Sequence, residues 1–268
     1  MIKINGNELK VGHFPDGTQS IEFPKYISVQ SYVEIWWLYD SDEEIFTLAS
    51  VVDWLKRKKV DDIRLFLPYV PNARMDRIKE EDQNFSLKVF TNILNSFGFS
   101  SVDVFNVHSN VSEALINNVN SVLPITDIAI TMEYYKPDVI FFPDEGACKR
   151  YADLEVVKRS NLPVTFGIKK RDFKSGKILG LDVISDIDLT GKKVLIIDDI
   201  CSAGGTFKFS AIKLKELGAK DVALYISHCE DNIKNGDLLT TDLISKIYTT
   251  DSILHIKDNK IKVITHYR

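Results

Sequence analysis

Residues 193–219 read KVLIIDDICSAGGTFKFSAIKLKELGA, and this stretch decides the fold of the chain. An apolar run at 194–197 has the composition of a buried strand and ends on two acids, Asp198 and Asp199. A short loop follows, and apolar residues then recur at helical spacing until Gly218, which is a typical helix stop. The pattern predicts a strand, a tight glycine turn and a helix.

The turn in this stretch has the features of an anion-binding cradle. It consists of small and hydroxyl residues: Ser202, Ala203, Gly204, Gly205 and Thr206. Glycines let the backbone approach a phosphate, and the free N–H groups of the next helix point toward it. Asp198 and Asp199, expected at the carboxyl end of the strand, are placed to accept hydrogen bonds from vicinal hydroxyls. Together these features predict a ribose 5-phosphate site; the alternative is an ordinary βα turn with solvated acids.

The composition is that of a globular protein, with 44% apolar and 27% charged residues. A length of 268 residues fits two domains of ordinary size. The net charge of −4 gives no basic field for nucleic acid or an anionic membrane. No apolar run has the length of a membrane span, and the first residues lack a signal-peptide core. Cys148, Cys201 and Cys229 match no metal or disulfide spacing, so we expect a cytoplasmic protein.

Strands alternate with helices along the whole chain. Apolar runs predict strands at 26–29, 63–67, 102–107, 139–142, 162–168 and 222–227. Helical patterns are predicted after a capping box of Ser41 and Glu44, at 85–97, at 127–135 and from Glu145 through Val157. The alternation predicts an α/β protein with two similar domains, residues 1–124 and 125–268, each a mainly parallel sheet flanked by helices. In such sheets active sites lie beyond the carboxyl ends of the strands.

Several charged residues stand at those strand ends. The loop after strand 63–67 carries Arg74 and Arg77, which could stack on a base or hold phosphate oxygens. His108 follows the third strand, where a structural role is the alternative. Lys169 and Arg171 lead into the polar segment 172–188, which is either a mobile lid or a solvated hairpin.

Four motifs extend this pattern: FPDG at 14–17, LPYVPNARMDR at 67–77, His108 after its strand, and FPDEG at 142–146 with IKKRD at 168–172 before DDICSAGGT. In this order and spacing, residues 14–228 resemble the ribose-phosphate pyrophosphokinase (PRPP synthetase) family, and 198–206 resembles the PRPP motif of the phosphoribosyltransferase fold. The arginine loop and the FPDG turn are not features of simple phosphoribosyltransferases, so they favour the synthetase.

The resemblance implies two phosphoribosyltransferase-like domains in a homo-oligomer, with ATP held between the domains and by a neighbouring subunit. The implied reaction is Mg²⁺-dependent transfer of the β,γ-diphosphoryl group of ATP to the anomeric hydroxyl of ribose 5-phosphate, which releases AMP and gives PRPP for nucleotide biosynthesis. The implied partners are therefore small molecules.

The resemblance also assigns residues. ATP would be contacted by Phe14, Asp16, Arg74, Met75 and Asp76, and the magnesium-associated positions are His108 and Asp144. Lys169 and Arg171 match the basic catalytic pair. Asp198 and Asp199 would hold the ribose hydroxyls, and the residues from Ser202 to Thr206, including Ala203, Gly204 and Gly205, would hold the 5-phosphate.

The chain departs from the family pattern in the 5-phosphate loop. The family usually has an acid and a threonine where this chain has Ser202 and Ala203. Such a loop could tolerate ADP-ribose as the acceptor, which would give ADP-ribose 1-pyrophosphate for NAD synthesis or salvage. Two other functions rank below diphosphoryl transfer to either acceptor. One is a non-catalytic regulatory subunit, and the other is a transferase that joins PRPP to a base. The acid pair and the basic pair argue against the first, and no base-binding hood is recognisable for the second.

Overall fold

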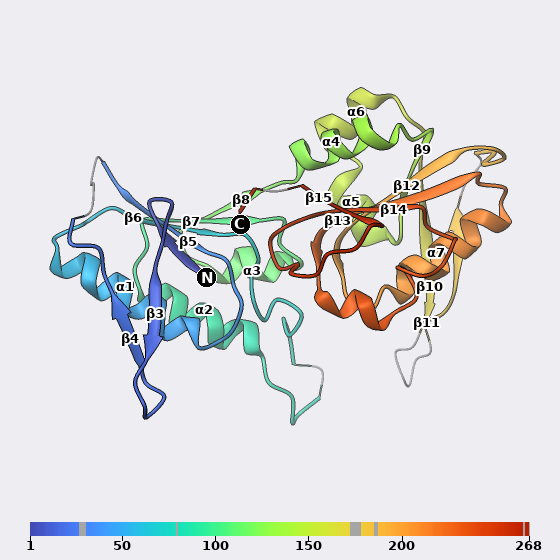
Figure 1. The fold of residues 1–268 in the computed structure, drawn as a ribbon. Helices are drawn as coiled ribbons and strands as arrows, with labels where there is room; N and C mark the ends of the chain where they lie inside the picture. The colour runs from blue at the N-terminus through green and yellow to red at the C-terminus, as the bar shows by residue number, and fades with distance from the viewer. Residues whose placement is uncertain (27–30, 79, 172–177, 185–186, 265, 268) are drawn as a thin grey trace. The chain divides into compact units, whose positions relative to one another are not determined.

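The computed structural model describes residues 1–26, 31–78, 80–171, 178–184, 187–264 and 266–267 (Figure 1). The chain forms two compact units, Met1–Leu123 with Tyr267, and Pro124–His266. The division falls one residue before the boundary predicted from the sequence. Each unit is built on a mostly parallel sheet, which confirms the predicted fold class.

The first unit has a six-stranded sheet in the order β2-β1-β5-β6-β7-β8. Its strands are β1 (Ile2–Ile4), β2 (Asn7–Glu8), β5 (Val33–Trp37), β6 (Ile63–Leu67), β7 (Ser101–Phe105) and β8 (Val119–Val122). Strands β5 to β8 are parallel, whereas β1 and β2 join the edge antiparallel. The predicted strand 63–67 is β6, while the strand expected at 102–107 ends at Phe105, because Asn106 adopts a φ of +41° and leaves the extended conformation. The strand expected at 26–29 lies almost entirely outside the described residues.

A separate hairpin of β3 (Lys10–His13) and β4 (Gln19–Glu22) carries the FPDG sequence at its tip. The turn predicted there is confirmed: the Gly17 N–H donates to the Phe14 carbonyl over 2.9 Å, and Gly17 has a φ of +85°. Thr18 donates twice to the Asp16 carboxylate, from its N–H over 3.0 Å and from its hydroxyl over 2.7 Å. The hydroxyl bond is the first cause, and the N–H bond the second, of the lowered pKa of Asp16.

The helices of the first unit are α1 (Glu44–Arg57), α2 (Ser86–Ser96) and α3 (Asn110–Leu115). The capping box expected from Ser41 and Glu44 is wrong, because α1 is capped at Glu43 and has no side-chain cap. The Glu44 carboxylate instead accepts hydrogen bonds from the Trp37 indole and the Asp40 N–H, both over 2.9 Å, and from the amino group of Met1. A tertiary contact thus replaces the local cap.

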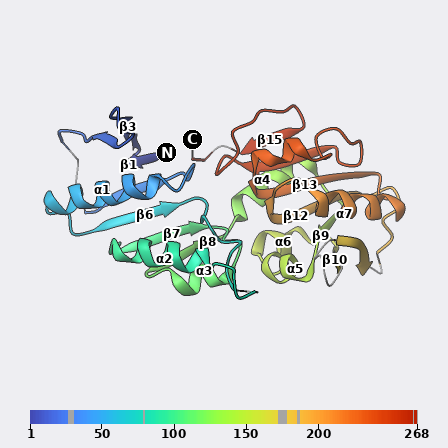
Figure 2. The same ribbon diagram turned by 90° about the horizontal axis from the view of Figure 1, so that it is seen from below.

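The second unit has a seven-stranded sheet in the order β11-β10-β9-β12-β13-β14-β15, in which only the β10–β11 pair is antiparallel. The strands are β9 (Val139–Phe142), β10 (Val164–Arg171), β11 (Ile178–Ile184), β12 (Lys193–Cys201), β13 (Asp221–Cys229), β14 (Lys246–Thr250) and β15 (Ile261–Ile264). The helices are α4 (Ile125–Tyr135), α5 (Glu145–Tyr151), α6 (Glu155–Ser160) and α7 (Gly205–Glu216), with a 3-10 turn η1 (Asp231–Asn235). Figure 2 shows the same elements from below.

Alternating side chains of β12 build two cores, one on each face of this sheet. Val194 and Ile196 pack with α7 residues such as Leu214, whereas Leu195 and Ile197 pack with residues of α4, α5 and α6. This alternation is the ordinary period of a strand that is buried on both faces. Helix α7 therefore covers one face and the other three helices cover the opposite face.

Three expectations for the second unit meet a different structure. The helix expected from Glu145 through Val157 is two helices, because α5 ends at Tyr151 and α6 begins at Glu155. The polar segment 172–188 contains β11, so Ile178–Ile184 form a hairpin with β10, and a role as a mobile lid stays a prediction. Residues 172–177 and 185–186 lie outside the described residues. Leu217, the last apolar residue before Gly218 in the predicted helical pattern, follows α7 and is 41% exposed.

In the part of the chain that the structure describes, no helix is both long enough and apolar enough to cross a bilayer.

Candidate active site

The two acids of the organising stretch lie inside a strand. We expected Asp198 and Asp199 just after it, but β12 continues to Cys201 because β13 extends alongside, with Cys201 opposite Cys229. Consecutive strand residues point to opposite faces, so the two carboxylates have different surroundings. Asp199 is buried and receives the Arg150 guanidinium over 2.9 Å, while Asp198 is half-buried and accepts the Asp199 N–H over 2.9 Å.

Arg150 comes from α5, at the carboxyl edge of the same sheet. Its helix begins directly after Asp144, whose carboxylate caps it by accepting the Ala147 N–H over 2.9 Å. Strands β9 and β12 are neighbours, with Phe141 opposite Ile196. Three residues after this pair, the chain reaches an acid in both cases, Asp144 after Phe141 and Asp199 after Ile196. The predicted acids of the second unit therefore gather at one edge. Arg150 was missed from the sequence, because nothing local links it to an acid 49 positions away.

The loop Ser202–Thr206, here called the acceptor loop, offers backbone donors. Gly204 is the N-cap of α7 with a φ of +83°, a conformation that favours glycine, and α7 has no side-chain cap. Among the described residues, the amide groups of Ala203, Gly204, Gly205 and Thr206 donate to no protein acceptor. Such uncapped amides at the positive end of a 12-residue helix attract an anion. The geometry fits the predicted phosphate cradle.

A segment that we did not predict packs on this loop. Residues 230–238 include η1, and the Glu230 N–H donates to the Cys201 carbonyl over 2.8 Å. The Asn232 amide donates to the Ser202 hydroxyl over 2.7 Å. A Cβ atom on Gly236 would lie 1.9 Å from the Ala203 carbonyl oxygen, so only glycine allows this approach. The only sequence signal was Gly236 itself, in a polar stretch typical of an ordinary loop.

The first unit holds the other candidate residues. Asp76 pairs with Arg77 over 2.7 Å and accepts the Ser109 hydroxyl over 2.7 Å. These two hydrogen bonds, and then the nearby charge of His108, hold the pKa of Asp76 well below its usual range, although partial burial opposes them. His108 is half-buried, whereas Arg74 and Met75 are exposed. The structure thus brings Asp76 close to His108. Phe14 is 56% exposed at its hairpin tip, and Asp16 is exposed beside it.

The predicted basic pair belongs to the β10–β11 hairpin. Lys169 lies opposite Leu181, and Arg171 lies opposite Ile178 after a β-bulge between Lys170 and Arg171. The backbone of these residues is described, while their side chains lie outside the description. The hairpin places both positions beyond the register that β10 shares with β9.

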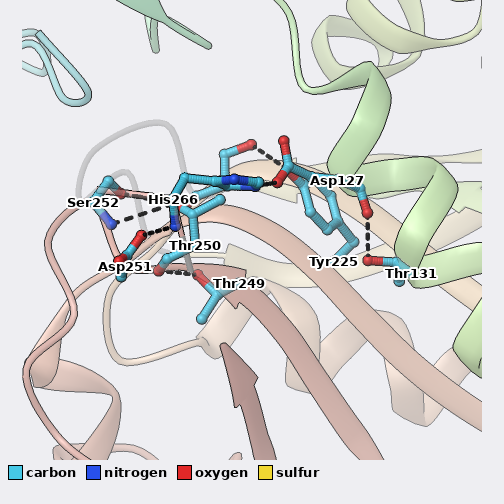
Figure 3. A network of polar contacts seen from close by, with 9 residues as sticks. Asp127, Thr131, Tyr225, Thr249, Thr250, Asp251, Ser252 and His266 are labelled. Atoms are coloured by element: carbon cyan, nitrogen blue, oxygen red, sulfur yellow. Dashed lines mark hydrogen bonds and ion pairs between the residues drawn. The ribbon is translucent and has the colours of Figure 1, made fainter. Parts of the chain in front are cut away.

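A second group of polar residues lies at the carboxyl ends of β13 and β14 (Figure 3). This group, here called the buried network, consists of the buried residues Asp127, Thr131, Tyr225, Ser227, His228, Thr249, Thr250, Asp251 and Ser252, together with the exposed His266. The Thr250 hydroxyl donates to the Ser227 carbonyl over 2.7 Å, and His228 Nδ1 lies 2.9 Å from the Ser252 hydroxyl. His266 Nε2 lies 2.6 Å from the Asp127 carboxylate. The side chains of this network form hydrogen bonds with one another or with neighbouring backbone groups.

Comparisons with known proteins agree with this geometry. The phosphoribosyl transferase domain family matches residues 125–256. A ribose-phosphate pyrophosphokinase of Thermococcus kodakarensis is 27% identical over 233 residues, which cover 82% of this chain and 77% of that protein. One of Sulfurisphaera tokodaii is 28% identical over 251 residues, covering 91% and 85%.

The chain is similar to ribose-phosphate pyrophosphokinases along most of its length. The resemblance predicted from the motifs is therefore confirmed. The phosphoribosylpyrophosphate synthetase of Mycobacterium smegmatis has the same fold, with a TM-score of 0.76 at 20% identity over 96% of this chain and 86% of that one. The acids of β12, Arg150 and the acceptor loop lie within the residues that the phosphoribosyl transferase domain matches.

Proposed function

We propose that this protein is an ATP-dependent diphosphotransferase. It transfers the β,γ-diphosphoryl group of ATP to the 1-hydroxyl of a 5-phosphorylated ribose and releases AMP. The observation that carries the proposal is the acceptor loop, whose amides have no acceptor among the described residues and which follows the acids of β12. The names of the relatives and the loop LPYVPNARMDR support a pyrophosphokinase rather than a simple transferase.

The sugar would bind at the end of β12. Asp198 and Asp199 accept hydrogen bonds from the 2- and 3-hydroxyls, and the Arg150 ion pair fixes the rotamer of Asp199. The 5-phosphate lies on the acceptor loop, where amides and the dipole of α7 neutralise its charge. The anomeric hydroxyl is thereby positioned for attack, which is the main requirement of phosphoryl transfer.

The nucleotide would bind through residues of the first unit. Arg74, Met75 and Asp76 contact ATP, with Phe14 and Asp16 completing the adenine site from a second copy of the chain in a homo-oligomer. Support comes from the exposure of Phe14 and Arg74 and from the fixed carboxylate of Asp76. The 1-hydroxyl oxygen forms a bond to Pβ as the bond from Pβ to the α,β-bridging oxygen breaks, so that AMP leaves. Lys169 and Arg171 stabilise the charge that is transferred.

A magnesium ion would be held mainly by the phosphates of ATP. Among the described residues, no group of three His, Cys, Asp or Glu side chains is arranged for a metal. Mg²⁺ commonly takes one or two carboxylates and completes its shell with water and substrate phosphates. Asp144 would offer a carboxylate oxygen in the second unit, and His108 is a separate predicted position in the first. When bound, Mg²⁺ would neutralise the phosphates of ATP.

ADP-ribose is a second candidate acceptor. Ala203 is exposed and brings no hydroxyl to the loop, and Ser202 brings no charge. The 5-phosphate of ADP-ribose is joined to a second phosphate through an anhydride bond, so it carries one negative charge fewer and needs room for that second phosphate. A loop with a small exposed residue at 203 provides that room. The product would then be ADP-ribose 1-pyrophosphate, a precursor in NAD metabolism.

AMP release from ATP and Mg²⁺ tests the proposal, with ribose 5-phosphate, ADP-ribose and no sugar run in parallel. Turnover with ribose 5-phosphate supports PRPP synthesis. Turnover only with ADP-ribose makes Ser202 and Ala203 the specificity determinants. No AMP with either sugar contradicts the proposal and favours a regulatory, non-catalytic subunit.

A further inference from the structure

We propose that Asn232 positions the Ser202 hydroxyl as a hydrogen-bond donor to the phosphate of the sugar. Asn232 lies in η1, outside every motif that the sequence analysis singled out. Its amide donates to the Ser202 hydroxyl oxygen over 2.7 Å, and its own carbonyl accepts the Asn235 amide over 2.8 Å. The inference rests on the proposed function, because it assigns a role within the same acceptor loop.

The argument starts from the hydrogen-bonding capacity of a serine. A hydroxyl has one donor and two acceptor positions. The Asn232 amide occupies an acceptor position on Ser202, so the Ser202 proton must point elsewhere. Among the described residues that hydroxyl donates to no protein acceptor. Ser202 is half-buried beside amides that also have no acceptor, so a phosphate oxygen bound there is its natural acceptor.

The surrounding segment holds Asn232 firmly against the loop. The Glu230 N–H reaches the Cys201 carbonyl, and Gly236 lies directly on the Ala203 carbonyl. A Cβ atom on Gly204 would lie 2.2 Å from a methyl carbon of Leu238. These contacts on both sides of Ser202 fix the segment 230–238 relative to the acceptor loop. The segment 230–238 therefore forms one wall of the acceptor loop, and Asn232 is its polar contact with Ser202.

The chemistry explains how a loop with alanine at 203 can still bind phosphate. Ala203 brings no hydroxyl to the loop, whereas Ser202 before it brings one. Asn232 makes that hydroxyl an effective donor, because its amide already occupies an acceptor position on the Ser202 oxygen.

The test measures ribose 5-phosphate binding by calorimetry and its KM by AMP release, in Ser202→Ala, Asn232→Ala, Asn232→Asp and the double variants with Ser202→Ala. Ser202→Ala should weaken binding about 10- to 100-fold, the loss of one hydrogen bond to a charged group. Asn232→Ala should weaken it several-fold alone but not in the Ser202→Ala background.

Asn232→Asp separates positioning from structure. Aspartate can keep the contact with Ser202 only by accepting its proton, so binding should be weaker than in Asn232→Ala. A merely structural contact would make aspartate the milder change. Glu216→Gln is the control, because it removes the exposed Lys213–Glu216 ion pair at the other end of α7 and should leave binding unchanged.

Additive effects of the Asn232 and Ser202 variants, or wild-type affinity in Ser202→Ala, would overturn the inference. No binding of ribose 5-phosphate to the wild-type protein would overturn it as well. Sugar binding with coupled Asn232 and Ser202 effects but no AMP release would keep the inference and reject the proposed reaction. AMP release with a sugar KM that is unchanged in Ser202→Ala would support the proposed reaction and reject the inference.

Discussion

The acceptor loop and the buried network contain similar polar side chains at the carboxyl edge of one sheet, yet they differ in where their hydrogen bonds go. In the network, Thr250, Ser252 and His228 bond to one another or to neighbouring backbone, and all are buried. In the acceptor loop, the donors from Ala203 to Thr206 have no acceptor within the described residues. Polar groups that satisfy one another stabilise a fold, whereas donors left over at a helix N-terminus are suited to a ligand. The first kind should affect stability and the second kind activity.

The largest expected effect concerns the basic pair of the β10–β11 hairpin. Lys169→Ala should lower kcat about 100- to 1,000-fold while ATP affinity stays near that of the wild type, because the charge acts on the group in transfer. Rapid-quench assays of AMP release and equilibrium binding of ATP measure the two quantities. A kcat close to the wild-type value would remove Lys169 from the site.

A change in loop geometry should come next. Gly236→Ala places a methyl group against the Ala203 carbonyl, so the loop must shift, and a shift of about 1 Å is expected to cost about 100-fold in kcat/KM for the sugar. Gly12→Ala is the control for an added methyl group that clashes with nothing, because Gly12 likewise has no positive φ and its Cβ would lie 3.7 Å from the nearest atom, the Ser20 carbonyl oxygen. Equal activity of the two variants would show that the wall formed by 230–238 has no role.

Asp199→Asn should raise the KM for the sugar about tenfold, because the acceptor of the sugar hydroxyls and the partner of Arg150 is weakened. Asp153→Asn removes an exposed acid that pairs with Lys158, and steady-state kinetics should show no change for it. An unchanged sugar KM in Asp199→Asn would favour the alternative, in which these acids belong to an ordinary βα turn that binds no sugar.

A substitution in the buried network should lower the stability of the fold and leave the activity unchanged. His266→Ala leaves the Asp127 carboxylate, which is 4% exposed, without its partner and should lower the free energy of unfolding by about 1–3 kcal/mol. The kcat/KM for the sugar should stay at the wild-type value. Urea unfolding and the AMP assay on the same preparation decide the point, and a loss of activity without a loss of stability would place the network in the active site.

The smallest effect is expected for alkylation of Cys201, the residue that precedes the acceptor loop. The hydrogen bond between the Cys201 and Cys229 thiols and then burial raise the pKa of the Cys201 thiol well above its ordinary value, so little of the reactive thiolate exists at pH 8. The half-buried Cys148, whose pKa is also raised by burial, should be alkylated first. Peptide mapping after iodoacetamide treatment gives the order; equal rates would mean that the loop opens in solution.

The sequence predicted what depends on local pattern. Strands β6 and β9 have the predicted bounds, and the helix expected at 85–97 is α2 with one residue fewer at each end. Gly218 ends the helical pattern with a φ of +92°. Apolar periodicity and glycine signals report such features because they act over a few residues.

What the sequence could not predict depends on contacts between distant residues. The capping box failed because Met1 and Trp37 bind the Glu44 carboxylate. Arg150 and Asn232 were missed because they meet Asp199 and Ser202 across 49 and 30 positions. Only the sheet register brings such residues together, and composition carries no trace of it.

One measurement tests the central claim most directly. ATP labelled in its γ-phosphate is incubated with Mg²⁺ and ribose 5-phosphate or ADP-ribose, and the nucleotide and sugar products are separated. We predict equal amounts of AMP and of a sugar that carries the label in a diphosphate, with no ADP. Formation of ADP, or the absence of labelled sugar with both acceptors, would contradict diphosphoryl transfer at this site.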